Sequence, residues 1–275
     1  GEVSFLLDRN KVALIDERLS VENAMYRGRD NRGRPFSLLA GEAVLAIMGP
    51  KARDLMQKVS PNDFSNAVNP FGTAQNIELG MGLARVHRVS YVGELGWEIY
   101  VSSDMAGHAF ETLYEAGEGM GLKLCGMHVM DCCRIEKAFR HFGHDITSED
   151  HVLEAGLGFA VGMNKADFIG REAVLKKKEA GLKKRMVQLR LTDPEPLLYH
   201  NEPVLRDGKI VSYISSGAYG HHLGGAMGMS YIPCAGESAA DVLGSTYEVD
   251  VMGTRVRAEV SLKPMYDPSA ERTKA

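Results

Sequence analysis

Two kinds of hydrophobic spacing alternate along the first half of the chain. Residues 43–48 form a continuous apolar run that ends at a Gly-Pro pair, which is typical of a buried strand, and residues 51–59 then carry apolar side chains at helical spacing. Residues 83–90 alternate between apolar and polar positions, and residues 104–118 return to helical spacing. A strand, a helix, paired strands and a second helix predict an α+β layer of sheet and helices.

Residues 126–142 predict a further helix that carries charged side chains on a separate stripe. Val129 and Cys133 can face inward, whereas Asp131 and Arg134 recur three residues apart on another side. Two interpretations stay open for that stripe. Asp131 and Arg134 form a surface ion pair worth well under about 1 kcal/mol, or the arginine reaches into a cleft and holds an anionic ligand tail, since a guanidinium matches carboxylate geometry.

The spacing changes after Gly181. Several short segments there alternate at a period of two and are separated by turns, which predicts a small antiparallel barrel. These segments are residues 186–191, 209–214, 247–251 and 255–260. We therefore expect two domains, residues 1–183 and a C-terminal β-barrel at residues 184–275, with a frayed tail from Arg272 onward.

The stretch between residues 91 and 101 holds the first candidate site. Its glycines predict a turn between a strand that ends at Tyr91 and a strand that starts at Trp97, which places Tyr91 and Glu98 at opposite ends of one tight loop. A carboxylate at a strand start beside an aromatic ring can accept two parallel N–H bonds from a planar heterocycle. The same pattern also fits an ordinary hairpin in which Glu98 is solvated and Tyr91 is a core residue.

Composition narrows the class of partner. The 275 residues are 44% hydrophobic and 25% charged, as in globular proteins. A net charge of -4 argues against a nucleic-acid binder, because no basic excess collects phosphates, so small molecules or proteins are the expected partners.

No apolar run approaches the roughly 18 residues of a membrane span. The four cysteines contain no C-x-x-C pair, which indicates reduced thiols in the cytoplasm, or in the mitochondrial matrix of a eukaryote.

Several motifs of cofactor and metal sites are missing from the sequence. The glycine-rich segments complete neither G-x-G-x-x-G after a strand nor G-x-x-x-x-G-K-[ST], so no dinucleotide or nucleoside triphosphate site is predicted. The histidines, including His221 and His222, follow no H-E-x-x-H or comparable ligand spacing. No metal site is therefore predicted.

The pattern Tyr-x-Gly-Glu-x-Gly-x-Glu at residues 91–98 resembles the hallmark loop of the glycine-cleavage T-protein, an aminomethyltransferase, and of the folate-binding region of dimethylglycine and sarcosine dehydrogenases. Further segments resemble the same family in the same order. These are residues 46–52, 134–136, 153–159, 168–171, 215–217 and 231–233. Residues 136–145 and 262–268 look closest to the FAD-dependent dehydrogenases. The resemblance implies that FAD belongs to an upstream domain or a flavoprotein partner, and a start at Gly1 agrees with this expectation.

The resemblance also implies an arrangement and a ligand. Small α/β domains and a C-terminal antiparallel barrel would surround a central funnel that holds tetrahydrofolate. Glu98 would bond the amino and ring N–H groups of the pterin, and Tyr91 would border the pterin or the aminobenzoyl portion. Arg134 falls in the arginine-bearing helix of the family and could face the glutamyl tail, although Met130 replaces a second arginine of T-proteins.

The reaction that the resemblance implies is capture of a one-carbon unit. Oxidation of an N-methyl amine of the dimethylglycine or sarcosine type gives an iminium ion or formaldehyde, and N5 of tetrahydrofolate attacks it to make 5,10-methylenetetrahydrofolate. The protein mainly holds the two reactants together and excludes water. Two other functions stay open: a stand-alone aminomethyltransferase that uses a lipoyl carrier, and a non-catalytic folate-binding remnant.

A catalytic carboxylate is expected in the N-terminal strand. The family places an aspartate near N5, where it can assist proton transfer, but residues 16–21 carry Arg18 at the expected position. Asp16 and Glu17 are the neighbouring substitutes, and we predict Asp16 as the catalytic residue. The alternative that neither carboxylate is catalytic stays open.

Overall fold

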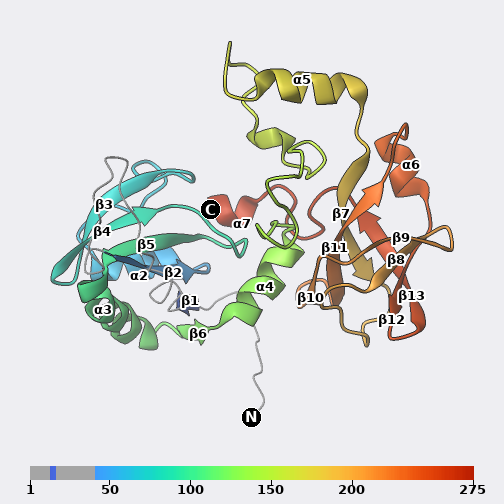
Figure 1. Ribbon diagram of the computed structural model, residues 1–275. Coiled ribbons are helices and arrows are strands. Elements are labelled where there is room, and N and C mark those ends of the chain that lie inside the picture. Colours follow the sequence, from blue (N-terminus) through green and yellow to red (C-terminus); the bar gives the residue numbers. More distant parts are fainter. Residues whose placement is uncertain (1–12, 17–40) are drawn as a thin grey trace. The chain divides into compact units, whose positions relative to one another are not determined.

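The computed structural model describes residues 13–16 and 41–275 (Figure 1). The chain divides into two compact units, one made of Gly1–Asp131 with Ser269–Ala275 and the other of Cys132–Pro268. Both units combine strands and helices, which confirms the predicted α+β class. The predicted domain boundary near residue 183 follows the change in hydrophobic spacing, and it stays a prediction.

The first unit contains a six-stranded sheet with the order β3-β4-β5-β2-β1-β6. Neighbouring strands are antiparallel except for β1 and β6, which are parallel. The strands are β1 (Ala13–Asp16), β2 (Glu42–Met48), β3 (Ala74–Leu79), β4 (Gly82–His87), β5 (Gly96–Ser102) and β6 (Lys123–Cys125). β2 lies near the middle of this sheet, which agrees with its continuous apolar sequence.

Two helices cover one face of this sheet, α2 (Ala52–Val59) and α3 (Ala106–Glu118), with a short 3-10 turn η2 (Ser103–Met105) before α3. Ala109 and Leu113 are buried one turn apart in α3, so the predicted apolar stripe faces the sheet. Alternate residues of β2 and β5, among them Ile47, Trp97 and Ile99, complete the core between sheet and helices. Both predicted helices are thus confirmed.

β4 and β5 form the predicted hairpin, in which His87 lies opposite Glu98. Their connection runs through residues 88–95, so it is a longer bent loop rather than a tight turn. Gly93 takes a φ of 77° within the loop. At Gly96 a side chain would collide with the carbonyl oxygen of Ile47. Glycine therefore allows β5 to lie close against β2.

The C-terminal residues are not the frayed tail that the sequence predicted. They form a short helix, α7 (Glu271–Lys274), that packs within the first unit. Arg272 makes an ion pair with Glu94 at 2.7 Å, and the buried guanidinium of Arg88 donates to the backbone oxygen of Ala275 at 2.6 Å. The tail is held because two charged side chains of the loop at residues 88–95 find their partners in it.

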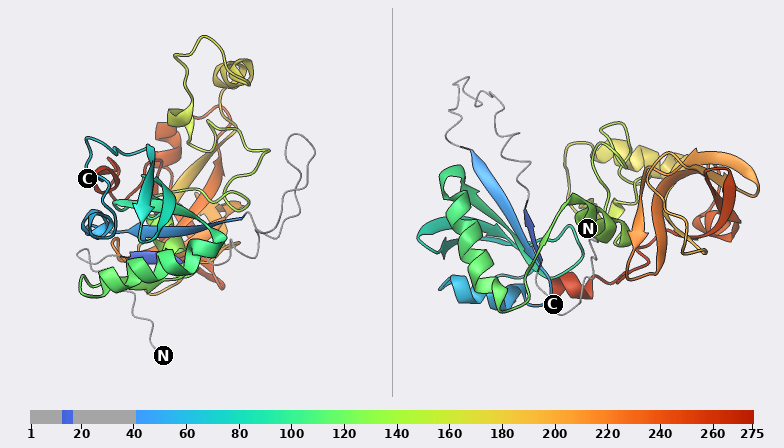
Figure 2. Two further views of the ribbon diagram at one scale, coloured as in Figure 1. Left: turned by 90° about the vertical axis from the view of Figure 1, so that its left-hand side faces the viewer. Right: turned by 90° about the horizontal axis from the view of Figure 1, so that it is seen from below.

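The second unit contains a seven-stranded antiparallel sheet with the order β10-β11-β7-β13-β12-β8-β9. The strands are β7 (Lys184–Leu191), β8 (Pro203–Arg206), β9 (Lys209–Tyr213), β10 (Ser216–Gly220), β11 (Gly225–Pro233), β12 (Tyr247–Val251) and β13 (Thr254–Ser261). The hydroxyl of Ser230 in β11 donates to the carbonyl of Tyr213 in β9 at 2.7 Å. The last strand of the order, β9, therefore meets β11, the second strand, and the sheet curls into the predicted barrel-like form (Figure 2).

The helix α4 (Met127–Glu136) is shorter than the predicted helix over residues 126–142. It ends because Ala138 takes a φ of 51°, which a continuing helix does not allow. The second unit also contains η3 (Gly158–Ala160), α5 (Arg171–Ala180) and α6 (Ala239–Gly244). Ser238 and Asp241 form a capping box at the start of α6.

Within residues 13–16 and 41–275, no helix combines the length and hydrophobicity that a membrane span requires.

Candidate functional site

Glu98 belongs to a row of polar side chains on the first unit's sheet. Side chains alternate along a strand, and Trp97 is buried against α2 and α3, so Glu98 and Tyr100 project from the other face of β5. On the neighbouring β4, Arg85 lies opposite Tyr100 and His87 lies opposite Glu98. Residues opposite one another share a face of the sheet. These four side chains therefore form one row, which we call the Glu98 row.

The geometry of the Glu98 row leaves part of the carboxylate open. The Tyr100 hydroxyl donates to Oε2 of Glu98 at 2.8 Å, and the ring centroids of His87 and Tyr100 lie 4.7 Å apart. The guanidinium of Arg85 lies 5.2 Å from the centroid of the Tyr100 ring. Among the described residues, no group donates to Oε1 of Glu98. The half-buried carboxylate can therefore accept a charge-assisted N–H bond at Oε1 and share Oε2 with the tyrosine.

The loop before Glu98 is held by its own hydrogen bonds. The hydroxyl oxygen of Ser90 accepts the backbone N–H groups of Val92 at 3.3 Å and Glu94 at 3.2 Å. Glu94 is also fixed by its ion pair with Arg272. Tyr91 is half-buried within this loop. That Tyr91 and Glu98 border the same ligand stays a prediction.

Arg134 lies in the second unit as a buried side chain, not as a surface residue. Its Nη1 donates to Asp145 at 2.6 Å and to the carbonyl of Phe139 at 3.2 Å, and its Nη2 donates to Ser216 at 2.9 Å. The side chains of Arg134 and Asp145 are 3% and 0% exposed. The surface ion pair considered for Arg134 is therefore wrong. Its contact with a glutamyl tail stays a prediction, and such a tail would share a guanidinium that already holds Asp145.

Asp16 is described through its backbone alone. It is the last residue of β1 and lies opposite Leu45 of β2. The next residue of β2, Ala46, lies opposite Glu98 of β5, the strand on the other side of β2. Its catalytic role stays a prediction. The alternative carboxylate, Glu17, lies outside the described residues.

Sequence analysis missed a buried cluster around Glu136. The Glu136 carboxylate accepts the backbone N–H groups of His222 at 2.7 Å and Leu223 at 3.1 Å, and Nδ1 of His222 lies 2.6 Å from the second oxygen. The imidazole ring stacks on Tyr266 with centroids 4.2 Å apart. The sequence shows both parts of this cluster, the histidine pair at residues 221–222 and the Arg-Ile-Glu segment at residues 134–136. No local pattern indicates that they are in contact, because 86 residues separate Glu136 from His222.

The cysteines and the possible metal ligands add no further site in the described part of the chain. No group of three or more His, Cys, Asp or Glu side chains there is placed to hold a metal ion. The four cysteines are free thiols. Burial raises the pKa of Cys125 and is the main cause of the raised pKa of Cys234, so both thiols stay protonated near neutral pH and are poor nucleophiles.

Two family models match the chain in consecutive segments. The GCVT N-terminal domain matches residues 37–165, and the glycine cleavage T-protein C-terminal barrel domain matches residues 184–267. The glycine cleavage system aminomethyltransferase T of Bartonella henselae has the same fold, with a TM-score of 0.69 over 82% of this chain and 60% of that chain. Its sequence identity to this chain is 23%.

Three curated proteins are similar in sequence to most of this chain, and each contains further residues outside the matched part. The 4-methylaminobutanoate oxidase (formaldehyde-forming) of Paenarthrobacter nicotinovorans is 41% identical over 91% of this chain and 30% of its own length. Human mitochondrial dimethylglycine dehydrogenase is 32% identical over 92% of this chain and 28% of its own length. The aminomethyltransferase of Symbiobacterium thermophilum is 33% identical over 82% of this chain and 59% of its own length.

This chain therefore spans less than two thirds of each of these three relatives. These relatives include an aminomethyltransferase and a dimethylglycine dehydrogenase, the two kinds of protein that the motif at residues 91–98 predicted. Because both domain models match in order and the fold is shared, the chain belongs to the folate-dependent, aminomethyltransferase-like family of the glycine-cleavage T-protein.

Proposed function

We propose that this chain binds tetrahydrofolate and captures the one-carbon unit of an oxidised N-methyl amine as 5,10-methylenetetrahydrofolate. The amine belongs to the class of dimethylglycine, sarcosine and other N-methyl amino acids. The observation that carries the proposal is the carboxylate of Glu98, at the matched motif position, with Oε2 held by Tyr100 and Oε1 open. The substrate class is supported by the oxidase and the dimethylglycine dehydrogenase among the relatives.

The donor and acceptor groups of the Glu98 row fit one edge of a pterin. That edge presents amino and ring N–H donors, and an ionised carboxylate is the matching acceptor. Because Tyr100 already restrains Glu98, less side-chain entropy is lost when the ligand binds. His87 and Tyr100 add flat aromatic surface beside the carboxylate.

Each partner in the reaction then has a limited task. Bound tetrahydrofolate supplies a nucleophilic nitrogen for the one-carbon unit. Glu98 fixes the orientation of the pterin, and Asp16 is the carboxylate that we propose to hold a proton beside that nitrogen. Oxidation of the amine needs FAD, which we assign to a flavoprotein segment or partner outside these 275 residues.

A titration with tetrahydrofolate under anaerobic conditions tests the binding step. Replacing Glu98 by alanine removes a charged hydrogen-bond acceptor, and we expect a loss of roughly 2–5 kcal/mol, or about thirtyfold to a few thousandfold in Kd. Tyr100→Phe keeps the carboxylate and is expected to weaken binding by about twofold to tenfold. Glu78→Ala removes an exposed carboxylate of β3 in the same sheet and serves as the matched control.

The outcomes of this titration separate the proposal from its rivals. A folded Glu98→Ala protein that binds as tightly as the wild type would show that Glu98 does not recognise the pterin. A wild-type protein that binds no tetrahydrofolate would contradict the proposed function. Binding without any turnover in the reactions below would identify a non-catalytic folate-binding remnant.

Turnover measurements identify the source of the one-carbon unit. We expect 5,10-methylenetetrahydrofolate to form from dimethylglycine when a flavoprotein dehydrogenase is present, and not when it is omitted. A stand-alone aminomethyltransferase is the second candidate, because the match covers 59% of the Symbiobacterium enzyme but only 30% of the oxidase. Formation of product from an aminomethylated lipoyl carrier would favour that candidate. Asp16→Asn is expected to lower turnover and leave the Kd for tetrahydrofolate unchanged.

A further inference from the structure

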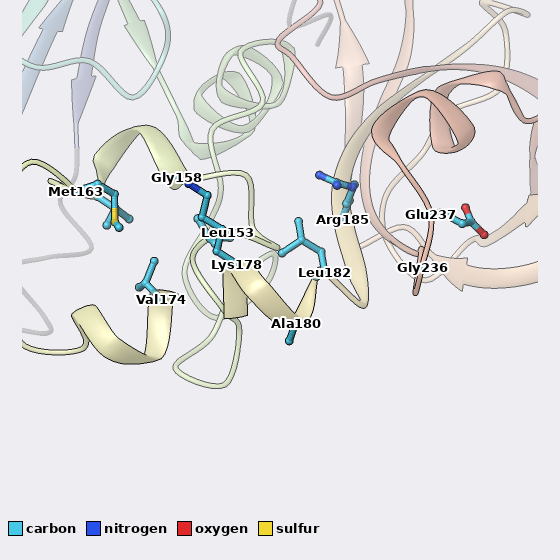
Figure 3. A pocket seen from close by; sticks show the side chains of 12 residues that line it. Leu153, Gly158, Met163, Val174, Lys178, Ala180, Leu182, Arg185, Gly236 and Glu237 are labelled. Atoms are coloured by element: carbon cyan, nitrogen blue, oxygen red, sulfur yellow. The ribbon is translucent and has the colours of Figure 1, made fainter. Parts of the chain in front are cut away.

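A cavity of about 640 Å³ lies in the second unit between α5 and the start of β7 (Figure 3). Its volume falls within the roughly 300–1,000 Å³ that is usual for small-molecule sites. The wall is mainly aliphatic, with Leu153 and Met163 before α5, Val174 within α5 and Leu182 after it. None of these residues belongs to the Glu98 row, so the proposed folate site does not explain this cavity.

The charged groups at the cavity are predominantly cationic. Lys178 and Arg185 line it, and the buried Nε of Arg185 has no hydrogen-bond partner among the described residues. The carboxylate of Glu237 also lines the cavity, but it makes an ion pair with Arg206 at 2.6 Å. The charge of Glu237 is therefore compensated. The guanidinium of Arg185 interacts with the thiol of Cys234, which is a weak acceptor, but its buried Nε–H lacks an acceptor. A buried polar group without a partner is costly, and an anion would satisfy it.

The packing of α5 also leaves room for a ligand. Val174 is the one buried residue of this ten-residue helix. A helix of that length is marginal in water and depends on tertiary packing of its apolar side. The apolar side of α5 at Val174 borders the cavity. An aliphatic group in the cavity would add contacts to this side of the helix.

We propose that this cavity binds an aliphatic carboxylate, with its head group on Arg185 and Lys178 and its chain against Leu153, Met163 and Val174. The cations select the charge of the head group, and the aliphatic wall selects an apolar chain. The site is separate from tetrahydrofolate binding and does not depend on the proposed function. Its occupation stabilises α5 against the barrel strands of the same unit.

Isothermal titration with octanoate, decanoate and dodecanoate, each below its micelle concentration, tests the proposal. The Kd is expected to fall about fourfold for each added methylene, which corresponds to about 0.8 kcal/mol per buried methylene. Decanol and decyltrimethylammonium, which share the chain but lack the anion, are expected to bind at least tenfold more weakly than decanoate. A Kd that does not depend on chain length, or equal binding of decanol, would overturn the proposal.

Three variants test the residues themselves. Arg185→Gln is expected to weaken decanoate binding by roughly tenfold to a hundredfold, as for loss of a charge-assisted hydrogen bond. Lys176→Gln removes an exposed charge of α5 that does not line the cavity, and it is expected to leave the Kd unchanged. If Arg185→Gln does not fold, Val174→Phe places a bulkier side chain in the wall that the ligand chain would contact, and it is expected to weaken decanoate binding by about tenfold or more while the protein stays folded. Unchanged decanoate binding by a folded Arg185→Gln or Val174→Phe protein would show that the ligand does not occupy this cavity.

Discussion

Replacing Asp145 by alanine leaves the guanidinium of Arg134 buried without its carboxylate. Asp145 accepts hydrogen bonds from Arg134 at 2.6 Å and from the backbone N–H of His141 at 2.8 Å, and Ser215 donates to its other oxygen. Both partners of the ion pair are almost completely buried. Removal of one partner from such a pair costs about 3–5 kcal/mol, because the remaining charge is not solvated. We therefore expect Asp145→Ala to destabilise the second unit by that amount.

Hydrogen exchange of the backbone amides in β10 and β11 measures this loss within the second unit. The expected 3–5 kcal/mol corresponds to exchange that is roughly a hundredfold to a few thousandfold faster, if these amides exchange through unfolding of the unit. The double variant Arg134→Met with Asp145→Ala removes the isolated charge as well. It is expected to exchange more slowly than Asp145→Ala alone.

The matched control is the exposed ion pair between Arg85 and Glu42, whose side chains are 46% and 51% exposed. Glu42→Ala is expected to cost less than about 1 kcal/mol in the first unit, because water solvates the remaining charge. The reasoning about Asp145 would be refuted if Asp145→Ala changed the exchange rates as little as this control does. It would also be refuted if the double variant were less stable than Asp145→Ala.

Two further predictions concern backbone packing and pH. Gly96→Ala is expected to destabilise the first unit by about 1–3 kcal/mol, because the added Cβ collides with β2. Gly107→Ala is expected to be neutral or stabilising, because its Cβ meets open space. Urea titration followed by the fluorescence of the single tryptophan measures the free energy of unfolding of both variants. Burial is the largest single influence on the pKa values of Asp150 and Glu154 and acts to raise them. The hydrogen bonds and charges of Lys184 and Lys177, together with backbone N–H donors, outweigh burial in sum and hold both pKa values below normal. Because these folded-state pKa values lie below the unfolded ones, the stabilisation is present above about pH 4.5 and is lost as the pH falls further. The thermal midpoint of the second unit, followed by circular dichroism, should fall over that range, and less steeply in Lys184→Met.

Hydrophobic periodicity alone determined several elements in each unit. The apolar run at residues 43–48 became β2, the helical spacings became α2 and α3, and the period-two segments after Gly181 became strands of the curled sheet. These signals are local, because the period of the apolar side chains matches the geometry of the element that buries them. The hydrogen-bond partner of Glu98 could also be predicted from the sequence, because Tyr100 lies two residues further along β5 and shares its face of the strand.

The tertiary structure decided which polar groups are buried and what they contact. The residues from Arg272 onward are polar, and their sequence predicts a frayed tail. They are ordered because Arg272 makes an ion pair with Glu94 and the backbone oxygen of Ala275 accepts a hydrogen bond from Arg88. Arg134 occupies a helix stripe that looks solvent-exposed, but it is buried against Asp145 and against Ser216, which lies 82 residues away. A sequence pattern shows which side of an element is apolar. It does not show which distant donor or acceptor will replace water around a charge, because that choice exists only once the chain has folded.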